Sequence, residues 1–177
     1  MKACILHKIG DLRCETMPEP APGPLEALVR VGACGVCGSD IPRIFEKGAH
    51  TMPLVPGHEF AGTVVAAGSL VEATLVGKRV AVFPLIPCGK CALCEIGAYA
   101  QCGNYTYLGS RCNGAFAEYV AVPAVNCIPL PDNLSFESGA MAEPAAVAAH
   151  AVRRGNVKAG DSVLIFGAGP IGLLAAQ

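Results

Sequence analysis

The sequence has almost no net charge and no long apolar run. Its 13 Lys and Arg residues nearly balance its 14 Asp and Glu residues, which gives a formal net charge of −1. A chain this neutral offers no basic surface for nucleic acid or for an anionic membrane, so we expect neither as a partner. No stretch approaches the roughly 20 consecutive apolar residues that a membrane-spanning helix needs. Residues 1–5 also lack a signal-peptide core and cleavage site, so we expect a cytoplasmic protein.

What the sequence does contain favours a folded, β-rich protein. Apolar residues make up 53% of the 177 positions, which supports a sizeable core and excludes intrinsic disorder. The length suits one full domain and the start of a second. The 21 glycines and 14 prolines indicate many turns between short strands rather than a helical bundle.

Branched apolar segments predict strands over the first 130 residues. Several of these segments are bounded by Gly or Pro, as the short strands of a barrel or sandwich usually are. The expected strands span residues 3–7, 25–31, 61–67, 79–83 and 116–122.

The pattern changes after residue 130. Ser135 and Ser138 offer N-cap chemistry for a following helix. An alanine-rich segment over residues 143–154 predicts a helix, which two arginines and Gly155 bring to an end. Residues 162–166 are mostly branched and apolar, and they predict one further strand.

Ten cysteines in a chain without an export signal are the most informative feature of the composition. Disulfides are rare in a reducing compartment, so clustered thiols indicate metal binding or redox chemistry. Four of them lie within fifteen residues with the spacing Cys-x2-Cys-x2-Cys-x7-Cys, at Cys88, Cys91, Cys94 and Cys102. A closed set of four thiolates leaves no position for a substrate, which indicates a structural zinc that holds this lobe folded. An iron–sulfur cluster and buried free cysteines are the alternatives.

A second, mixed set of metal-ligating residue types comprises Cys37, His58, Glu59 and Glu143. Cysteine, histidine and carboxylate together suit a catalytic zinc that keeps one position open. Each residue alone is a weak signal, because a single histidine beside a strand is more often structural. Cys34 and Cys37 also form a Cys-x-x-Cys pair of the thioredoxin type, although the strands that follow do not alternate with helices as that fold requires.

The motif Gly-His-Glu-x2-Gly-x5-Gly-x2-Val over residues 57–71 resembles the signature of the zinc-dependent medium-chain dehydrogenases. Cys37, the four-cysteine lobe, Glu143 and a later glycine-rich motif occur in the order of that family. The chain is similar to its sorbitol and threonine dehydrogenase branch. Short strings at residues 37–45, 48–50 and 109–111 are similar to the galactitol-1-phosphate 5-dehydrogenases.

The resemblance implies a fold and a division of the chain. A mainly β, GroES-like catalytic domain would cover residues 1–150. The first strand and turn of a Rossmann α/β domain, which is incomplete here, would follow over residues 151–177.

The same resemblance implies the metal ligands. Cys37, His58 and Glu143 would ligate a catalytic zinc, with Glu59 as an alternate or water-linked partner. Together with the structural ion of the cysteine lobe, this implies two zinc ions per chain.

The resemblance also implies a route for the substrate proton. Ser39 would pass that proton on, unless its hydroxyl only caps the following turn. Many members of the family have a histidine where this chain has Pro42. His50 is either its substitute or an ordinary surface residue. Arg43 and Arg111 are candidates for holding a substrate phosphate.

A glycine fingerprint lies near the end of the chain, at Gly167, Gly169 and Gly172. It follows the expected strand and opens a helix, which is the context in which it binds the pyrophosphate of a dinucleotide. The resemblance implies NAD, with NADP not excluded, because the residue that separates the two cofactors lies about twenty residues beyond the fingerprint. We therefore expect a truncated chain that binds metal without appreciable turnover.

The function implied for the intact protein is an oxidoreductase. It would transfer hydride from a secondary alcohol of a small-molecule polyol or polyol phosphate to the nicotinamide cofactor. Members of the family are homo-oligomers, usually through the cofactor domain. The alternative is a non-enzymatic, zinc-stabilised structural or binding module.

Overall fold

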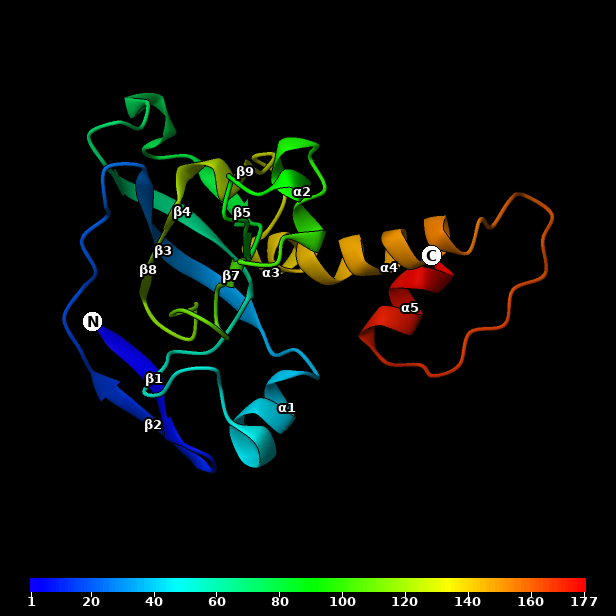
Figure 1. Ribbon diagram of the computed structural model, residues 1–177, viewed down its shortest axis with the longest axis horizontal. Coiled ribbons are helices and arrows are strands. Elements are labelled where there is room, and N and C mark those ends of the chain that lie inside the picture. The colour runs from blue at the N-terminus through cyan, green and yellow to red at the C-terminus, as the bar shows by residue number, and fades with distance from the viewer.

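The structure is a computed structural model that describes all of residues 1–177 (Figure 1). Its centre is a five-stranded antiparallel sheet in the order β8-β3-β4-β5-β9. These strands are β3 (Glu26–Gly35), β4 (Glu59–Ala67), β5 (Arg79–Val82), β8 (Tyr119–Pro123) and β9 (Cys127–Pro129). The expected mainly β fold class is confirmed.

Two short antiparallel ribbons complete the β structure. They are β1 (Lys2–Lys8) with β2 (Asp11–Thr16), and β6 (Leu85–Ile86) with β7 (Thr106–Tyr107). The sequence analysis missed β2, β6, β7 and β9. Strand β2 has a charged residue at every second position and no buried residue, and the other three strands have only two or three residues each, too few to show an alternating pattern.

The core lies on one side of the central sheet and is built mostly from valine. Burial alternates from one residue to the next along β8, where Val120 and Val122 are buried and Ala121 between them is half-buried. Phe60 of β4 is the largest side chain in this cluster and is 1% exposed. The members of the cluster are Ala27, Val29, Phe60, Val64, Val80, Val82, Leu108, Ala115, Val120, Val122 and Cys127.

Helices α3 (Phe136–Ala140) and α4 (Ala142–Arg154) follow the β region; α4 is the helix predicted over residues 143–154, whereas α3 was not predicted as a separate helix. The Ser135 hydroxyl caps α3 by accepting a hydrogen bond from the Ser138 backbone N–H at 3.2 Å. The Phe136 ring packs so tightly on β3 that a Cβ at Gly32 would lie 2.4 Å from it. The guanidinium of Arg79 covers the same ring at 4.5 Å, so α3 is fixed to the sheet and sets where α4 begins.

The remaining helical segments are short. A helical turn, α1 (Asp40–Pro42), runs into a π-helical turn (Arg43–Lys47), and α2 (Ala92–Glu95) lies in the cysteine lobe. Three 3-10 turns cover Ala73–Leu75, Tyr99–Gln101 and Ala124–Asn126. None of the helices combines the length and the hydrophobicity that crossing a bilayer requires.

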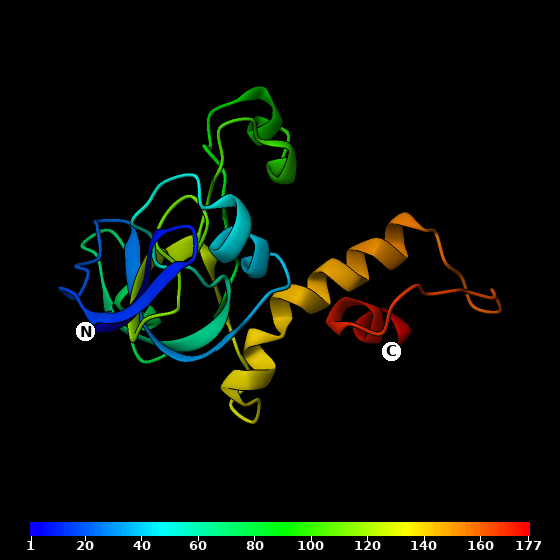
Figure 2. The ribbon, with the colours of Figure 1, turned by 90° about the horizontal axis from the view of Figure 1, so that it is seen from below.

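The predicted strand over residues 162–166 is wrong, because this segment forms no strand in the structure. A strand is stable only when a neighbour pairs with its backbone, and no other segment lies alongside this one. Leu164 and Phe166 are consequently 77% and 93% exposed. Figure 2 shows the segment as a loop away from the sheet, returning to α5 (Pro170–Ala176), which packs against α4.

Candidate metal centres

The four cysteines of the lobe converge on one point. The sulfur of Cys91 lies 3.5 Å from that of Cys94 and 3.9 Å from that of Cys102, and the sulfurs of Cys88 and Cys94 are 4.0 Å apart. Four thiolates around a tetrahedral zinc at 2.3 Å have sulfurs about 3.8 Å from one another. The donor set and its spacing therefore fit zinc.

Backbone geometry in the lobe prepares one of these thiols for metal binding. Hydrogen bonds with the Lys90 backbone N–H and with the Cys102 side chain lower the pKa of Cys88 to about 6, whereas burial raises the pKa of Cys94 to about 11. The chain turns sharply at Gly89 and Gly97, whose φ angles are +71° and +76°. These left-handed turns bring the ends of α2 back toward Cys88.

The central sheet assembles the second group. Cys37 follows β3, His58 directly precedes β4, and Glu59 opens β4, the strand paired with β3. The register places Gly35 opposite Glu59. The ligand atoms of Cys37, His58 and Glu59 lie within 4.8 Å of one another. Gly35 makes this approach possible, since a Cβ there would lie 2.5 Å from a Glu59 carboxylate oxygen.

His58 is held beside a buried carboxylate. Its side chain is almost fully enclosed, and its Nδ1 lies 3.5 Å from Asp40 Oδ1, too long for a hydrogen bond. Asp40 is 0% exposed and accepts from the Cys37 backbone N–H at 3.0 Å and from the Arg43 guanidinium. A carboxylate beside the non-ligating nitrogen commonly orients metal-bound histidines. The orphaned nitrogen and its acidic neighbour thus fit a metal at this group.

Glu143 lies near this group without joining its tight cluster. It stands in the first turn of α4, and its Oε1 accepts a hydrogen bond from the Tyr107 hydroxyl at 3.1 Å. The Tyr107 ring in turn makes an edge contact with His58, with centroids 5.7 Å apart. Burial raises the pKa of the Glu143 carboxyl, and Tyr107 and His58 oppose that rise. The structure therefore brings Cys37, His58 and Glu59 together, and Glu143 is connected to them through the Tyr107 side chain.

Ser39 lies beside the Cys37 thiol. Its hydroxyl donates to the Cys37 sulfur at 3.3 Å. Burial raises the pKa of Cys37, and the bonds from Ser39 act in the opposite direction. A hydroxyl in this position can relay a proton, because its oxygen can accept one from a group bound in the cavity while its own hydroxyl proton leaves.

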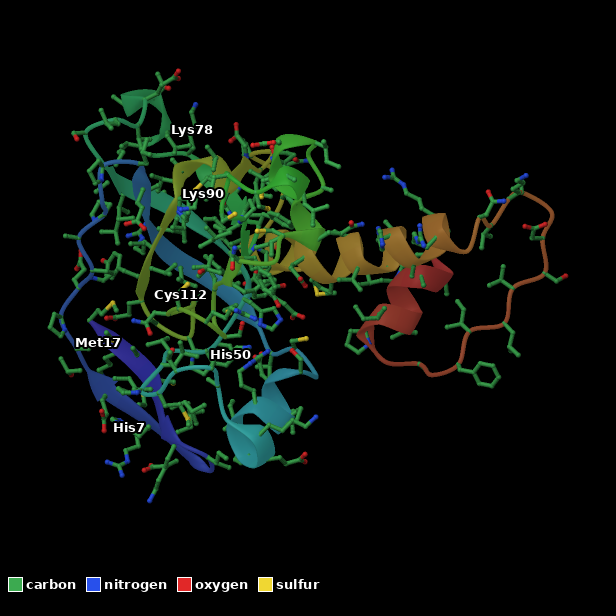
Figure 3. The ribbon with its side chains drawn as sticks, viewed as in Figure 1. His7, Met17, His50, Lys78, Lys90 and Cys112 are labelled. Carbon is green, nitrogen blue, oxygen red and sulfur yellow. The ribbon has the colours of Figure 1, made fainter.

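A cavity of about 650 Å³ opens in front of this group. Ser39 and His58 line it on the side of this group, together with Pro42 and Tyr107. His50, labelled in Figure 3, lines it as well. The remaining lining residues are Arg43, Lys47, Gly48, Ala49, Tyr105, Ser110 and Arg111.

The loop before β4 is locked to a second loop by glycine contacts. The Gly57 carbonyl accepts from the Ala115 backbone N–H at 3.0 Å. A Cβ at Gly109 would lie 2.5 Å from the Gly57 oxygen, and one at Gly114 would lie 2.0 Å from it. We call Gly57, Gly109 and Gly114 the glycine crossing. It joins the loop that carries His58 to the loop that carries Arg111.

The glycine fingerprint lies away from the cavity, at the start of α5. Gly169 is the N-cap of this helix, and Gly167 has a φ of +99°. A Cβ at Gly172 would lie 2.1 Å from the Gly167 oxygen, so the turn closes only with glycine there. The turn expected for the fingerprint is therefore present, although the strand before it is not.

Sequence reasoning missed Asp40 and Tyr107. Asp40 stands three residues after Cys37, the spacing at which a short acidic side chain can accept from a preceding backbone N–H, and this signal was available. Tyr107 gave no signal, because its role depends on the β6–β7 ribbon, which the sequence did not predict.

Comparison with known proteins identifies the family. The profile of the alcohol dehydrogenase GroES-like domain matches residues 23–132. The chain belongs to this family, and the resemblance to the zinc-dependent medium-chain dehydrogenases is confirmed.

Among curated relatives, galactitol 1-phosphate 5-dehydrogenase of Escherichia coli (strain K12) is 45% identical over 152 residues, which are 86% of this chain and 44% of that protein. Sorbitol dehydrogenase of Bombyx mori is 39% identical over 181 residues, covering 99% of this chain and 52% of that protein. The chain thus spans about half the length of the curated relatives it matches.

Solved structures agree. Galactitol-1-phosphate dehydrogenase from Escherichia coli has a TM-score of 0.93 at 41% identity, covering 99% of this chain and 51% of that one. An alcohol dehydrogenase from Escherichia coli CFT073, complexed with the cofactor NADH, also reaches 0.93, at 38% identity and with the same coverage. The GroES-like fold expected from the sequence is confirmed.

Proposed function

We propose that this chain is the zinc-binding catalytic part of a polyol dehydrogenase, with residues 1–150 forming that domain and residues 151–177 beginning the cofactor domain. The observation that carries the proposal is the convergence of Cys37, His58 and Glu59 beside a 650 Å³ cavity, which His58 lines. Such mixed donors beside an open volume suit a metal that must also meet a substrate.

The proposed ligands of the catalytic zinc are Cys37, His58 and Glu143, with Glu59 as the alternate or water-linked fourth partner. When bound, zinc supplies Lewis-acid chemistry that lowers the pKa of a substrate hydroxyl. Asp40 presents its buried carboxylate to His58 Nδ1 at 3.5 Å. Ser39, beside the Cys37 sulfur, passes the substrate proton on: its oxygen accepts that proton as its own hydroxyl proton leaves toward the solvent of the cavity.

The lobe of Cys88, Cys91, Cys94 and Cys102 holds the second, structural zinc in this proposal. The hydride acceptor is a nicotinamide cofactor, NAD in the first place with NADP as the alternative. Gly167, Gly169 and Gly172 form the turn that admits its pyrophosphate. The similarity to an NADH-complexed dehydrogenase supports this assignment.

The proposed substrate is a polyol phosphate, with galactitol 1-phosphate oxidised to tagatose 6-phosphate as the specific reaction. The 45% identity to a galactitol 1-phosphate 5-dehydrogenase supports it. We further propose a cytoplasmic homo-oligomer, and the free state of all ten cysteines suits a reducing compartment. The chain of 177 residues alone is expected to bind metal without appreciable turnover.

Native mass spectrometry of the purified chain tests this function. We expect two zinc ions per chain, and no reduction of NAD when galactitol 1-phosphate is added. A single zinc in the wild-type chain, with a count that His58→Ala leaves unchanged, would mean that only the lobe binds metal and would favour a zinc-stabilised structural or binding module. Iron in place of zinc would overturn the dehydrogenase assignment.

A further inference from the structure

The cavity that Ser39 and His58 line has a cationic wall. Arg43, Lys47 and Arg111 line it, and no aspartate or glutamate does. In a chain whose overall charge is close to zero, this concentration of one sign is local and favours an anionic ligand.

Two of these three cations are free to bind a ligand. Arg43 is neutralised by the buried Asp40, whose Oδ1 lies 2.5 Å from its Nη1. The side chains of Lys47 and Arg111 form no ion pair and donate no hydrogen bond within the chain. The Arg111 guanidinium stacks over the Tyr105 ring at 4.3 Å, which fixes its plane and leaves its N–H edge available for acceptors.

The two free cations come from segments far apart in the sequence. Lys47 ends the π-helical turn that follows the Cys37 loop, whereas Arg111 lies in the turn after β7. The His50 backbone N–H donates to the Ser110 carbonyl at 3.4 Å and so connects the two segments next to the cavity. Both cations thus face one volume that also contains Ser39 and His58.

We propose that Lys47 and Arg111 form an anion subsite that binds the phosphate monoester of the substrate and selects phosphorylated polyols over free polyols. This inference rests on the proposed function, because it places the phosphate in the cavity of the proposed catalytic zinc. A phosphate monoester carries a charge of about −1.5 to −2 at pH 7. Arginine meets its oxygens with a planar fork, and lysine adds a point charge.

The substrate, rather than the cofactor, is the source of this phosphate. The cofactor fingerprint at Gly167, Gly169 and Gly172 does not line the cavity. It opens α5, which lies next to α4 and apart from the π-helical turn in Figure 1.

Calorimetric titration of the zinc-loaded chain tests the subsite. The probes are galactitol 1-phosphate, galactitol and inorganic phosphate. We expect Lys47→Gln and Arg111→Gln each to lower the affinity for galactitol 1-phosphate by about tenfold or more, because each removes one charge-assisted hydrogen bond. The affinity for galactitol should not change. Arg111→Lys should recover part of the loss. Lys78→Gln, an exposed lysine outside this cavity (labelled in Figure 3), should change nothing.

Several outcomes would overturn the subsite while leaving the proposed function intact. The first is equal affinity of the wild-type chain for galactitol and for galactitol 1-phosphate. The second is unchanged phosphate binding in both variants, which is expected if phosphate binds only at zinc. The third is displacement of inorganic phosphate by NAD. Failure of the proposed function is seen separately, as a zinc count below two. Inorganic phosphate binding that depends on Lys47 and Arg111 would still support the subsite in that case.

Discussion

The four thiolates of the lobe come from fifteen consecutive residues, whereas Cys37, His58 and Glu143 come from three distant parts of the chain. The lobe has little core of its own, and its local turns place every ligand. The mixed group depends on the register of β3 and β4 and on the docking of α4. The difference teaches that a structural ion can organise a short segment, while an open metal site needs a folded sheet to exist first.

The largest expected effect is the loss of the lobe's fold. Cys102→Ser removes a buried thiolate, and a structural zinc contributes on the order of 10 kcal/mol to the folding of small zinc domains. We expect one zinc fewer by native mass spectrometry and rapid proteolysis within residues 88–102, with the sheet still folded. Cys14→Ser, at an exposed cysteine outside the lobe, is the control. A variant that keeps two zinc ions and resists protease would contradict the claim that the lobe needs all four thiolates to bind zinc and fold.

His58→Ala tests the other side of the comparison. Because the sheet forms this site, its loss should remove one zinc without unfolding the chain. The measurement is the zinc count together with the circular dichroism spectrum. His7→Ala, where the side chain pairs only with Glu15, should keep both ions. Unfolding of the whole chain on loss of His58 would show that the mixed site, too, is needed for folding.

Asp40→Asn should produce a smaller effect at the same site. The substitution keeps the shape of the side chain and removes the charge that faces His58 Nδ1. Replacing the partner of a metal-bound histidine typically lowers metal affinity by about 10- to 100-fold. Competition with a chelator measures the change, and the lobe should be unaffected. Asp11→Asn, where the side chain pairs with Arg13 on the surface, is the matched control.

In the metal-free chain, Glu143→Gln should produce the smallest change, and zinc should reverse its sign. Burial raises the pKa of Glu143 above its usual 4.5, so the folded chain holds that proton more tightly than the unfolded chain. Without metal, stability therefore falls as pH rises from the unfolded pKa through the folded pKa. The variant escapes this loss and should be more stable than wild type at pH 7.5, by less than about 1 kcal/mol, and equal to it near pH 4.

Zinc should reverse that order, because the variant lacks a ligand carboxylate. Urea unfolding at both pH values, with zinc and with chelator, measures the difference. Glu137→Gln is the control: the pKa of this exposed carboxyl is lowered by local hydrogen bonds, so its contribution to stability grows as pH rises. If Glu143→Gln destabilised the metal-free chain at pH 7.5, the burial argument would be wrong.

The sequence predicted most where chemistry is local. The cysteine spacing alone predicts that the four thiols of the lobe lie together. Ser135 caps α3, in line with the N-cap chemistry expected at this position. Long-range pairing was the weak point. Residues 162–166 have the composition of a strand, but a strand depends on a neighbour that composition does not describe. Asp40 and Tyr107 act through contacts formed only when β3, β4 and β7 are in place.

The glycine crossing limits how this protein can diverge. A single side chain at Gly57, Gly109 or Gly114 would push apart two backbones that meet without space for a methyl group. A residue larger than glycine at any one of these positions is tolerated only if both loops change together. New specificities in descendants of this sequence should therefore arise by exchanging side chains such as Lys47 and Arg111, on loops that keep their length and course.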